Sequence, residues 1–122
     1  MKHPSFVLLY VDHPLHSATF YHDLLGTAPV EVSPTFALFV LESGLRLGLW
    51  ARETVMPVTS ETRSSSFELA WPVETHAEVD ATAKDWASRG IPILQTPTQM
   101  DFGYTMTASD PDGHRVRVFC PT

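Results

Sequence analysis

The chain has 122 residues, with 8 lysines and arginines against 14 aspartates and glutamates, and a formal net charge of −6. An apolar fraction of 43% is enough for a folded core. The acidic balance argues against nucleic-acid binding, and the longest apolar runs, Phe6–Val11 and Phe36–Leu41, are too short for a membrane-spanning helix of about 20 residues. The single cysteine, Cys120, excludes an intrachain disulfide and a cysteine zinc site. We therefore expect a cytoplasmic protein.

The first half of the chain predicts a strand followed by a helix. The strand is the apolar run Phe6–Val11, and Asp12 and Pro14 are typical of a helix N-cap and first turn. The apolar residues that recur at helical spacing are Leu15, Ala18, Tyr21 and Leu25. Gly26 then supplies the left-handed residue that ends a helix.

The second half repeats this pattern. Phe67–Val73 predicts a strand, and Thr75 with Glu78 forms the sequence of a capping box. The apolar positions of the helix that follows are Val79, Ala83 and Trp86. Gly90 closes that helix, as Gly26 closes the first. Because a strand, a helix and a final glycine recur in the same order, the two halves look like two copies of one supersecondary unit.

Three short strands are expected after each helix. They are the runs near Pro29–Val32, Phe36–Leu41 and Leu45–Trp50 in the first half, and Ile91–Gln95, Phe102–Ala108 and Arg115–Phe119 in the second. The Asp-Pro-Asp-Gly sequence at 110–113 predicts a hairpin turn, with His114 capping it. We expect one α+β domain over residues 1–122, with a βαβββ unit at about 5–52, a linker at about 53–66 and a second βαβββ unit at about 67–120.

Three segments carry a family resemblance: LLYVDHPLHSATFYHDLLG in the first unit, WPVETHAEVDATAKDWASRG in the second, and the terminal SDPDGHRVRVF. The chain resembles the vicinal oxygen chelate superfamily, which includes glyoxalase I, extradiol dioxygenases and bleomycin-resistance proteins. Within it, the chain looks most like phenazine-antibiotic resistance proteins. The resemblance implies curved mixed sheets around a shared cleft, a homodimer, and drug binding without turnover.

Enzymes of this superfamily hold a divalent metal with four side chains, two from each unit. The matching positions in this chain are Phe6, Gly48, Glu68 and Arg117. Phenylalanine and glycine offer no side-chain donor, and a guanidinium repels a cation. We therefore expect no metal, no other cofactor and no catalysis by that route. The alternative is a metal-dependent lyase, isomerase or dioxygenase that uses displaced donors such as His114, Glu42 or Glu53.

The same positions suggest a binding site for a small molecule. Arg117 suits a ligand carboxylate, although the simplest alternative is an ion pair between Arg117 and Glu68. Trp50 ends a strand where a site wall is expected, whereas alternation along its strand turns Trp71 away from Glu68 and towards its helix. Trp86 is expected in the core.

Further apolar side chains are expected to wall the site. Alternation places Phe102, Tyr104 and Met106 on one strand face. The full set is Phe6, Phe36, Phe39, Phe102, Tyr104 and Met106. An aromatic site with one charge fits a planar, weakly acidic compound. We expect a non-catalytic protein that sequesters such a compound, possible examples being phenazine antibiotics; a domain that serves only in assembly is the remaining alternative.

Overall fold

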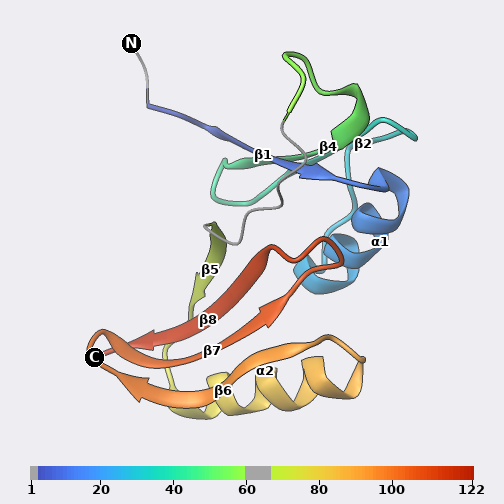
Figure 1. The fold of residues 1–122 in the computed structure, drawn as a ribbon. Coiled ribbons are helices and arrows are strands. Elements are labelled where there is room, and N and C mark those ends of the chain that lie inside the picture. Colours follow the sequence, from blue (N-terminus) through green and yellow to red (C-terminus); the bar gives the residue numbers. More distant parts are fainter. Residues whose placement is uncertain (1–2, 60–66) are drawn as a thin grey trace. The chain divides into compact units, whose positions relative to one another are not determined.

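The computed structural model describes residues 3–59 and 67–122, and the chain divides into two compact units within residues 1–61 and 62–122 (Figure 1). Each unit contains a four-stranded mixed sheet and one α-helix, in the order βαβββ. The predicted α+β fold class is therefore confirmed. No helix among the described residues is both long and apolar enough to span a membrane.

Unit 1 contains a parallel pair of strands, and a helix follows the first of them in the chain. Its elements are β1 (Phe6–Val11), α1 (Pro14–Leu25), β2 (Glu31–Val32), β3 (Phe36–Val40) and β4 (Arg46–Ala51), followed by the short 3-10 helix η1 (Arg52–Thr54). The strand order is β1-β4-β3-β2; β1 runs parallel to β4, and the other pairs are antiparallel. The helix provides the crossover that a parallel pair requires.

Side-chain alternation divides the sheet of unit 1 into two faces. One face packs against α1, and its members are almost completely buried: Leu9, Val11, Ala37, Phe39, Leu47, Leu49 and Ala51. Tyr21 of α1 is also fully buried. The opposite face, called here the open face of unit 1, carries the intervening residues of β1, β3 and β4.

The start of α1 differs from the prediction. The N-cap is His13, without a side-chain cap, and Pro14 opens the helix as expected. Asp12 instead forms an ion pair with Arg52, whose Nε lies 3.3 Å from the Asp12 carboxylate, and Arg52 Nη2 also donates to the carbonyl oxygen of Tyr10. The Asp12 carboxylate therefore joins the end of β1 to η1. Gly26 ends the helix at φ 69°, as predicted.

Unit 2 repeats the topology. Its elements are β5 (Glu68–Pro72), α2 (His76–Ser88), β6 (Ile93–Met100), β7 (Gly103–Ser109) and β8 (Arg115–Pro121), with strand order β5-β8-β7-β6. Figure 1 shows α2 along one face of this sheet. The predicted capping box is present, because Thr75 Oγ1 accepts from Glu78 N and Glu78 Oε2 accepts from Thr75 N.

Two details of unit 2 depart from the prediction. The strand β6 begins at Ile93 and extends to Met100, whereas the expected strand was Ile91–Gln95. Its pairing with β7 shifts register twice, between Ile93 and Gln95 and between Gln95 and Thr98. Phe102 lies in the turn before β7. Gly103 begins the strand at φ 152°, where a Cβ atom would collide with the carbonyl oxygen of Cys120. The turn therefore breaks the alternation that was expected from Phe102 to Met106.

The turn between β7 and β8 forms as predicted. The buried carboxylate of Asp110 accepts hydrogen bonds from the backbone N–H groups of Asp112 and His114, both at 2.8 Å. The imidazole Nδ1 of His114 lies 2.8 Å from the other oxygen of the same carboxylate. His114 therefore caps the hairpin. Of the expected linker at 53–66, residues 60–66 lie outside the described residues.

The capping box predicts a pH-dependent contribution to stability. Hydrogen bonds from the backbone N–H groups of Glu74 and Thr75 lower the pKa of Glu78 below its usual 4.5. A lowered folded-state pKa stabilises the fold above the unfolded pKa, and that contribution is lost as the pH falls through the folded value. In urea unfolding, Glu78→Gln should have a lower free energy of unfolding than wild type at pH 7. This difference in free energy should disappear below about pH 4.

The control is Glu74→Gln, which removes a neighbouring exposed carboxylate outside the capping box. It should unfold like wild type across the same pH range. If the free energy of unfolding of Glu78→Gln differs from that of wild type by the same amount from pH 7 to pH 3, the charge of Glu78 makes no contribution.

Candidate functional site

The open face of unit 1 is an exposed apolar surface. Phe6, Leu8 and Tyr10 of β1 point away from α1 and keep 50%, 44% and 37% of their accessible surface. A shallow hollow of about 530 Å³ lies on this face and is lined by Phe6, Leu8, Phe36 and Trp50. Large hydrophobic side chains are usually buried, so a contiguous exposed group of them indicates a surface that binds a ligand or another protein.

Trp50 lies between aromatic residues on both neighbouring strands. The strand register places it opposite Tyr10 on β1 and opposite Phe36 on β3. Its ring meets that of Tyr10 edge to face, with centroids 6.2 Å apart and planes at 84°. Trp50 is half-buried, so one part of the indole is held in place while another part faces solvent. This arrangement suits ring stacking against a planar molecule.

Gly48 allows the hollow to form. It lies between Arg46 and Trp50 on the same face of β4, and a Cβ atom there would lie 2.6 Å from Leu8 Cδ2 and 3.0 Å from Phe36 Cζ. These distances are shorter than van der Waals contact. The side chains of Leu8 and Phe36 therefore extend over the backbone of Gly48 and form the floor of the hollow.

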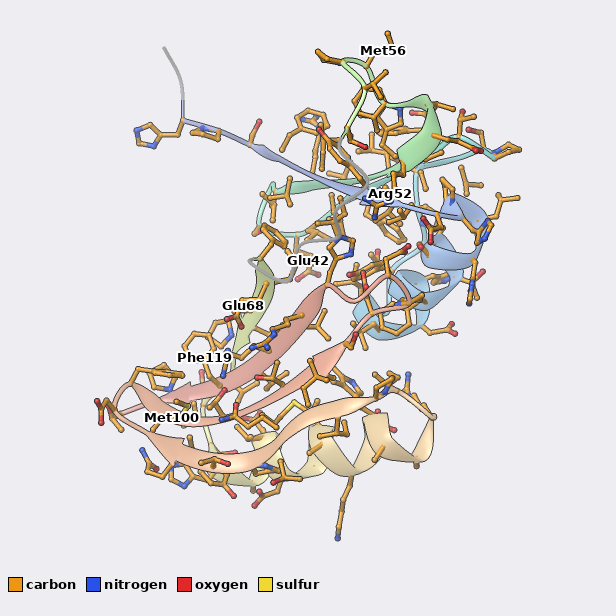
Figure 2. The ribbon with its side chains drawn as sticks, viewed as in Figure 1. Glu42, Arg52, Met56, Glu68, Met100 and Phe119 are labelled. Carbon is orange, nitrogen blue, oxygen red and sulfur yellow. The ribbon has the colours of Figure 1, made fainter. Side chains whose placement is uncertain are left out.

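The corresponding face of unit 2, pointing away from α2, is polar. Arg117 of β8 is its centre: Nε donates to Glu68 Oε2 at 2.5 Å, and Nη1 donates to Gln95 Oε1 at 3.2 Å and to Thr105 Oγ1 at 3.1 Å. Thr107 donates to the same Gln95 oxygen. Figure 2 shows Glu68 on β5 and Phe119 on β8, on the side of the sheet away from α2.

Aromatic rings flank this polar cluster. The guanidinium carbon of Arg117 lies 5.7 Å from the centre of the Phe102 ring, and the Phe102 and Phe119 rings are 6.2 Å apart. The side chains of Arg117 and Glu68 are 16% and 37% exposed. The ion pair that we considered as the simplest explanation is therefore formed, and it neutralises the charge of Arg117 before any ligand arrives.

Three residues expected to wall the site are on the helix-covered faces instead. Phe39 and Met106 are completely buried. Tyr104 lies against α2, where its ring stacks on His76 at 4.4 Å and its hydroxyl donates to Asp80 at 2.7 Å. The expectation that Tyr104 and Met106 share a face with Phe102 is wrong, because the turn at Asp101–Phe102 precedes the strand.

The remaining tryptophans lie where strand alternation and helical spacing predict. Trp71 points towards α2 and meets Trp86 edge to face at 6.3 Å, and Trp86 is buried.

The phenol of Tyr104 is held by α2. Its hydrogen bond to Asp80, followed by partial desolvation, raises the pKa of Tyr104 above its usual value.

The four family metal positions do not fit a metal ion. Phe6 presents an exposed ring, and Gly48 has no side chain to donate. Glu68 is already bound by Arg117, and Arg117 is a cation. A divalent ion needs several oxygen, nitrogen or sulfur donors. Within residues 3–59 and 67–122, no three His, Cys, Asp or Glu side chains gather into an alternative ligand set.

Two βαβββ units, each with one helix-covered and one open face, define a glyoxalase-fold protein. Residues 3–118 match the family model described as the Glyoxalase/Bleomycin resistance protein/Dioxygenase superfamily, and the chain belongs to that superfamily. It is 31% identical over 121 residues to the phenazine antibiotic resistance protein EhpR of Enterobacter agglomerans, covering 97% of this chain and 91% of that protein.

Solved structures share the fold. A protein from Agrobacterium tumefaciens, solved by solution NMR, is 53% identical with a TM-score of 0.90, covering 100% of this chain and 99% of that one. A glyoxalase-related enzyme from Fulvimarina pelagi is 23% identical with a TM-score of 0.84, covering 98% of this chain and 88% of that one. At 23% identity, this likeness shows the fold alone.

The ion pair between Arg117 and Glu68 is expected to stabilise the protein. Glu68→Ala should lower the free energy of unfolding by about 1–2 kcal/mol, because it leaves a largely buried guanidinium without its carboxylate. Chemical denaturation measures the change. Glu74→Ala removes an exposed carboxylate from the same unit and should change stability by less than about 0.5 kcal/mol. Equal stabilities for the two variants would mean that the pair contributes no more than a surface salt bridge.

Proposed function

We propose that the protein binds a small planar aromatic compound and sequesters it without chemical conversion. The observation that carries the proposal is the exposed aromatic surface of unit 1, where Trp50 lines the hollow together with Phe6, Leu8 and Phe36. Such a surface costs solvation free energy unless a ligand covers it. The 31% identity to a phenazine antibiotic resistance protein supports a flat, polycyclic ligand.

The chemistry of the four family metal positions supports binding over turnover. They lack the donors that would hold a Lewis acid, and a planar guest can be held by stacking alone. In this proposal Arg117 and Glu68, with Phe102 beside them, form a polar contact surface on unit 2. Because the two charges are already paired, that surface offers hydrogen bonds to a polar substituent without net charge.

We also propose that the protein acts as a homodimer in the cytoplasm. The resemblance to small members of the superfamily supports this assembly. Size-exclusion chromatography with light-scattering detection should give a mass near twice 13.6 kDa. A mass of one chain across the micromolar range would contradict the dimer without affecting the binding proposal.

Removing the Trp50 ring tests the ligand surface. Trp50→Ala should weaken binding of phenazine-type compounds about tenfold or more, since ring stacking adds about 0.5–1.5 kcal/mol to the contribution of buried area. Isothermal titration calorimetry measures affinity without depending on a tryptophan signal, and circular dichroism checks that the variant folds.

The matched control is Leu94→Ala, which shortens another exposed apolar side chain, on β6 of unit 2. Its affinity should equal that of wild type. Unchanged affinity in Trp50→Ala would remove Trp50 from the site. Binding that occurs only after addition of Mn²⁺ or Ni²⁺ would contradict the metal-free proposal.

A further inference from the structure

Arg46 is a cation at the edge of the aromatic surface of unit 1. It is the first residue of β4, it is exposed, and it points to the open face together with Gly48 and Trp50. The register places it opposite Phe6 on β1 and Val40 on β3. Its guanidinium carbon lies 5.6 Å from the centre of the Phe6 ring, and Phe6 itself lines the hollow.

The charge of Arg46 is not neutralised by another described residue. Arg52, Arg89 and Arg117 each pair with a carboxylate, of Asp12, Asp85 and Glu68 respectively. Within residues 3–59 and 67–122, no carboxylate lies within ion-pair distance of the Arg46 side chain. A guanidinium stacked beside a ring keeps its outer N–H groups available for an anion, and its planar shape suits a carboxylate.

The spacing along β4 fits one elongated guest. Arg46 and Trp50 are four residues apart on the same strand face, a separation of about 13 Å at the rise of an extended chain. The apolar floor over Gly48 lies between them. A fused-ring acid that stacks on Trp50 can therefore direct its acidic group towards Arg46 across this floor.

We propose that the ligand is a planar aromatic anion and that Arg46, not Arg117, binds its acidic group. This inference rests on the proposed function and adds the charge of the ligand and the residue that selects it. The cation of Arg117 is already compensated by Glu68, whereas among residues 3–59 and 67–122 the Arg46 side chain contacts the Phe6 ring and no carboxylate. The register aligns Glu31 of β2 with Leu38 and Gly48, level with the middle of the floor and two strands away from β4. The charge of Glu31 is therefore set apart from the Arg46 end of the hollow.

The test compares a matched pair of ligands, phenazine-1-carboxylate and the neutral phenazine-1-carboxamide, by calorimetry on the full chain at neutral pH. Wild type should bind the carboxylate about tenfold more tightly, the size expected for one charge-assisted hydrogen-bonded pair. Arg46→Gln should abolish this preference while leaving affinity for the carboxamide within about twofold. Arg46→Lys should retain part of the preference, and higher salt should reduce it in wild type.

Arg115→Gln is the matched control. Arg115 is the first residue of β8, as Arg46 is of β4, it is exposed, and its loss changes the net charge equally. This variant should keep the full preference for the carboxylate. Glu31→Gln should keep it as well, because Glu31 makes no attractive contribution to an anion.

Three outcomes would overturn the inference. A preference that survives in Arg46→Gln but disappears in Arg117→Gln would make Arg117 the counter-ion. Equal affinity of wild type for the two ligands, still weakened by Trp50→Ala, would leave the proposed function standing and remove the assigned charge. Failure of both ligands to bind would remove the proposed function and this inference together.

Discussion

The parallel pairing of the first and last strands within each unit is the constraint on which the rest of the structure depends. β1 pairs with β4, and β5 with β8, and in each case the connection passes through a helix that covers one face of the sheet. Because side chains alternate, covering one face leaves the opposite face of the sheet without a helix over it. The helix-covered side chains form the core, and those of the opposite face are free to carry function.

The two units carry different side chains on the face of the sheet that has no helix over it. In unit 1 the open face is aromatic and aliphatic, with one cation at its edge; in unit 2 the equivalent strands carry a guanidinium held by a carboxylate, an amide and a hydroxyl. The helix-covered faces are alike, because both must exclude water. Duplicated topology therefore does not imply duplicated chemistry, and each open face has to be interpreted from its own side chains.

Much of the fold was predictable from the sequence, because its signals are local. The capping box at Thr75, the glycine after α1 and the direction of Trp71 follow from short-range rules of spacing. The errors arose where one residue changed the register: the turn at Phe102 reversed the faces expected for Tyr104 and Met106. The role of Asp12 depended on Arg52, 40 residues away, which no local pattern reveals. Arg46 shares the parity of Trp50, so alternation could have placed it on the same face. Only the three-dimensional structure shows that no carboxylate of residues 3–59 and 67–122 lies within ion-pair distance of it.

The closeness of Leu8 and Phe36 to Gly48 determines what the centre of β4 can accept. A Cβ atom at position 48 would lie 2.6 Å from Leu8 Cδ2 and 3.0 Å from Phe36 Cζ, so a larger residue there requires both side chains to move. Leu8 is exposed, and its close atom is the end of its side chain, so the movement reshapes the floor of the hollow and leaves the backbone of the sheet in place. The shape of the hollow is therefore more sensitive to position 48 than the fold is.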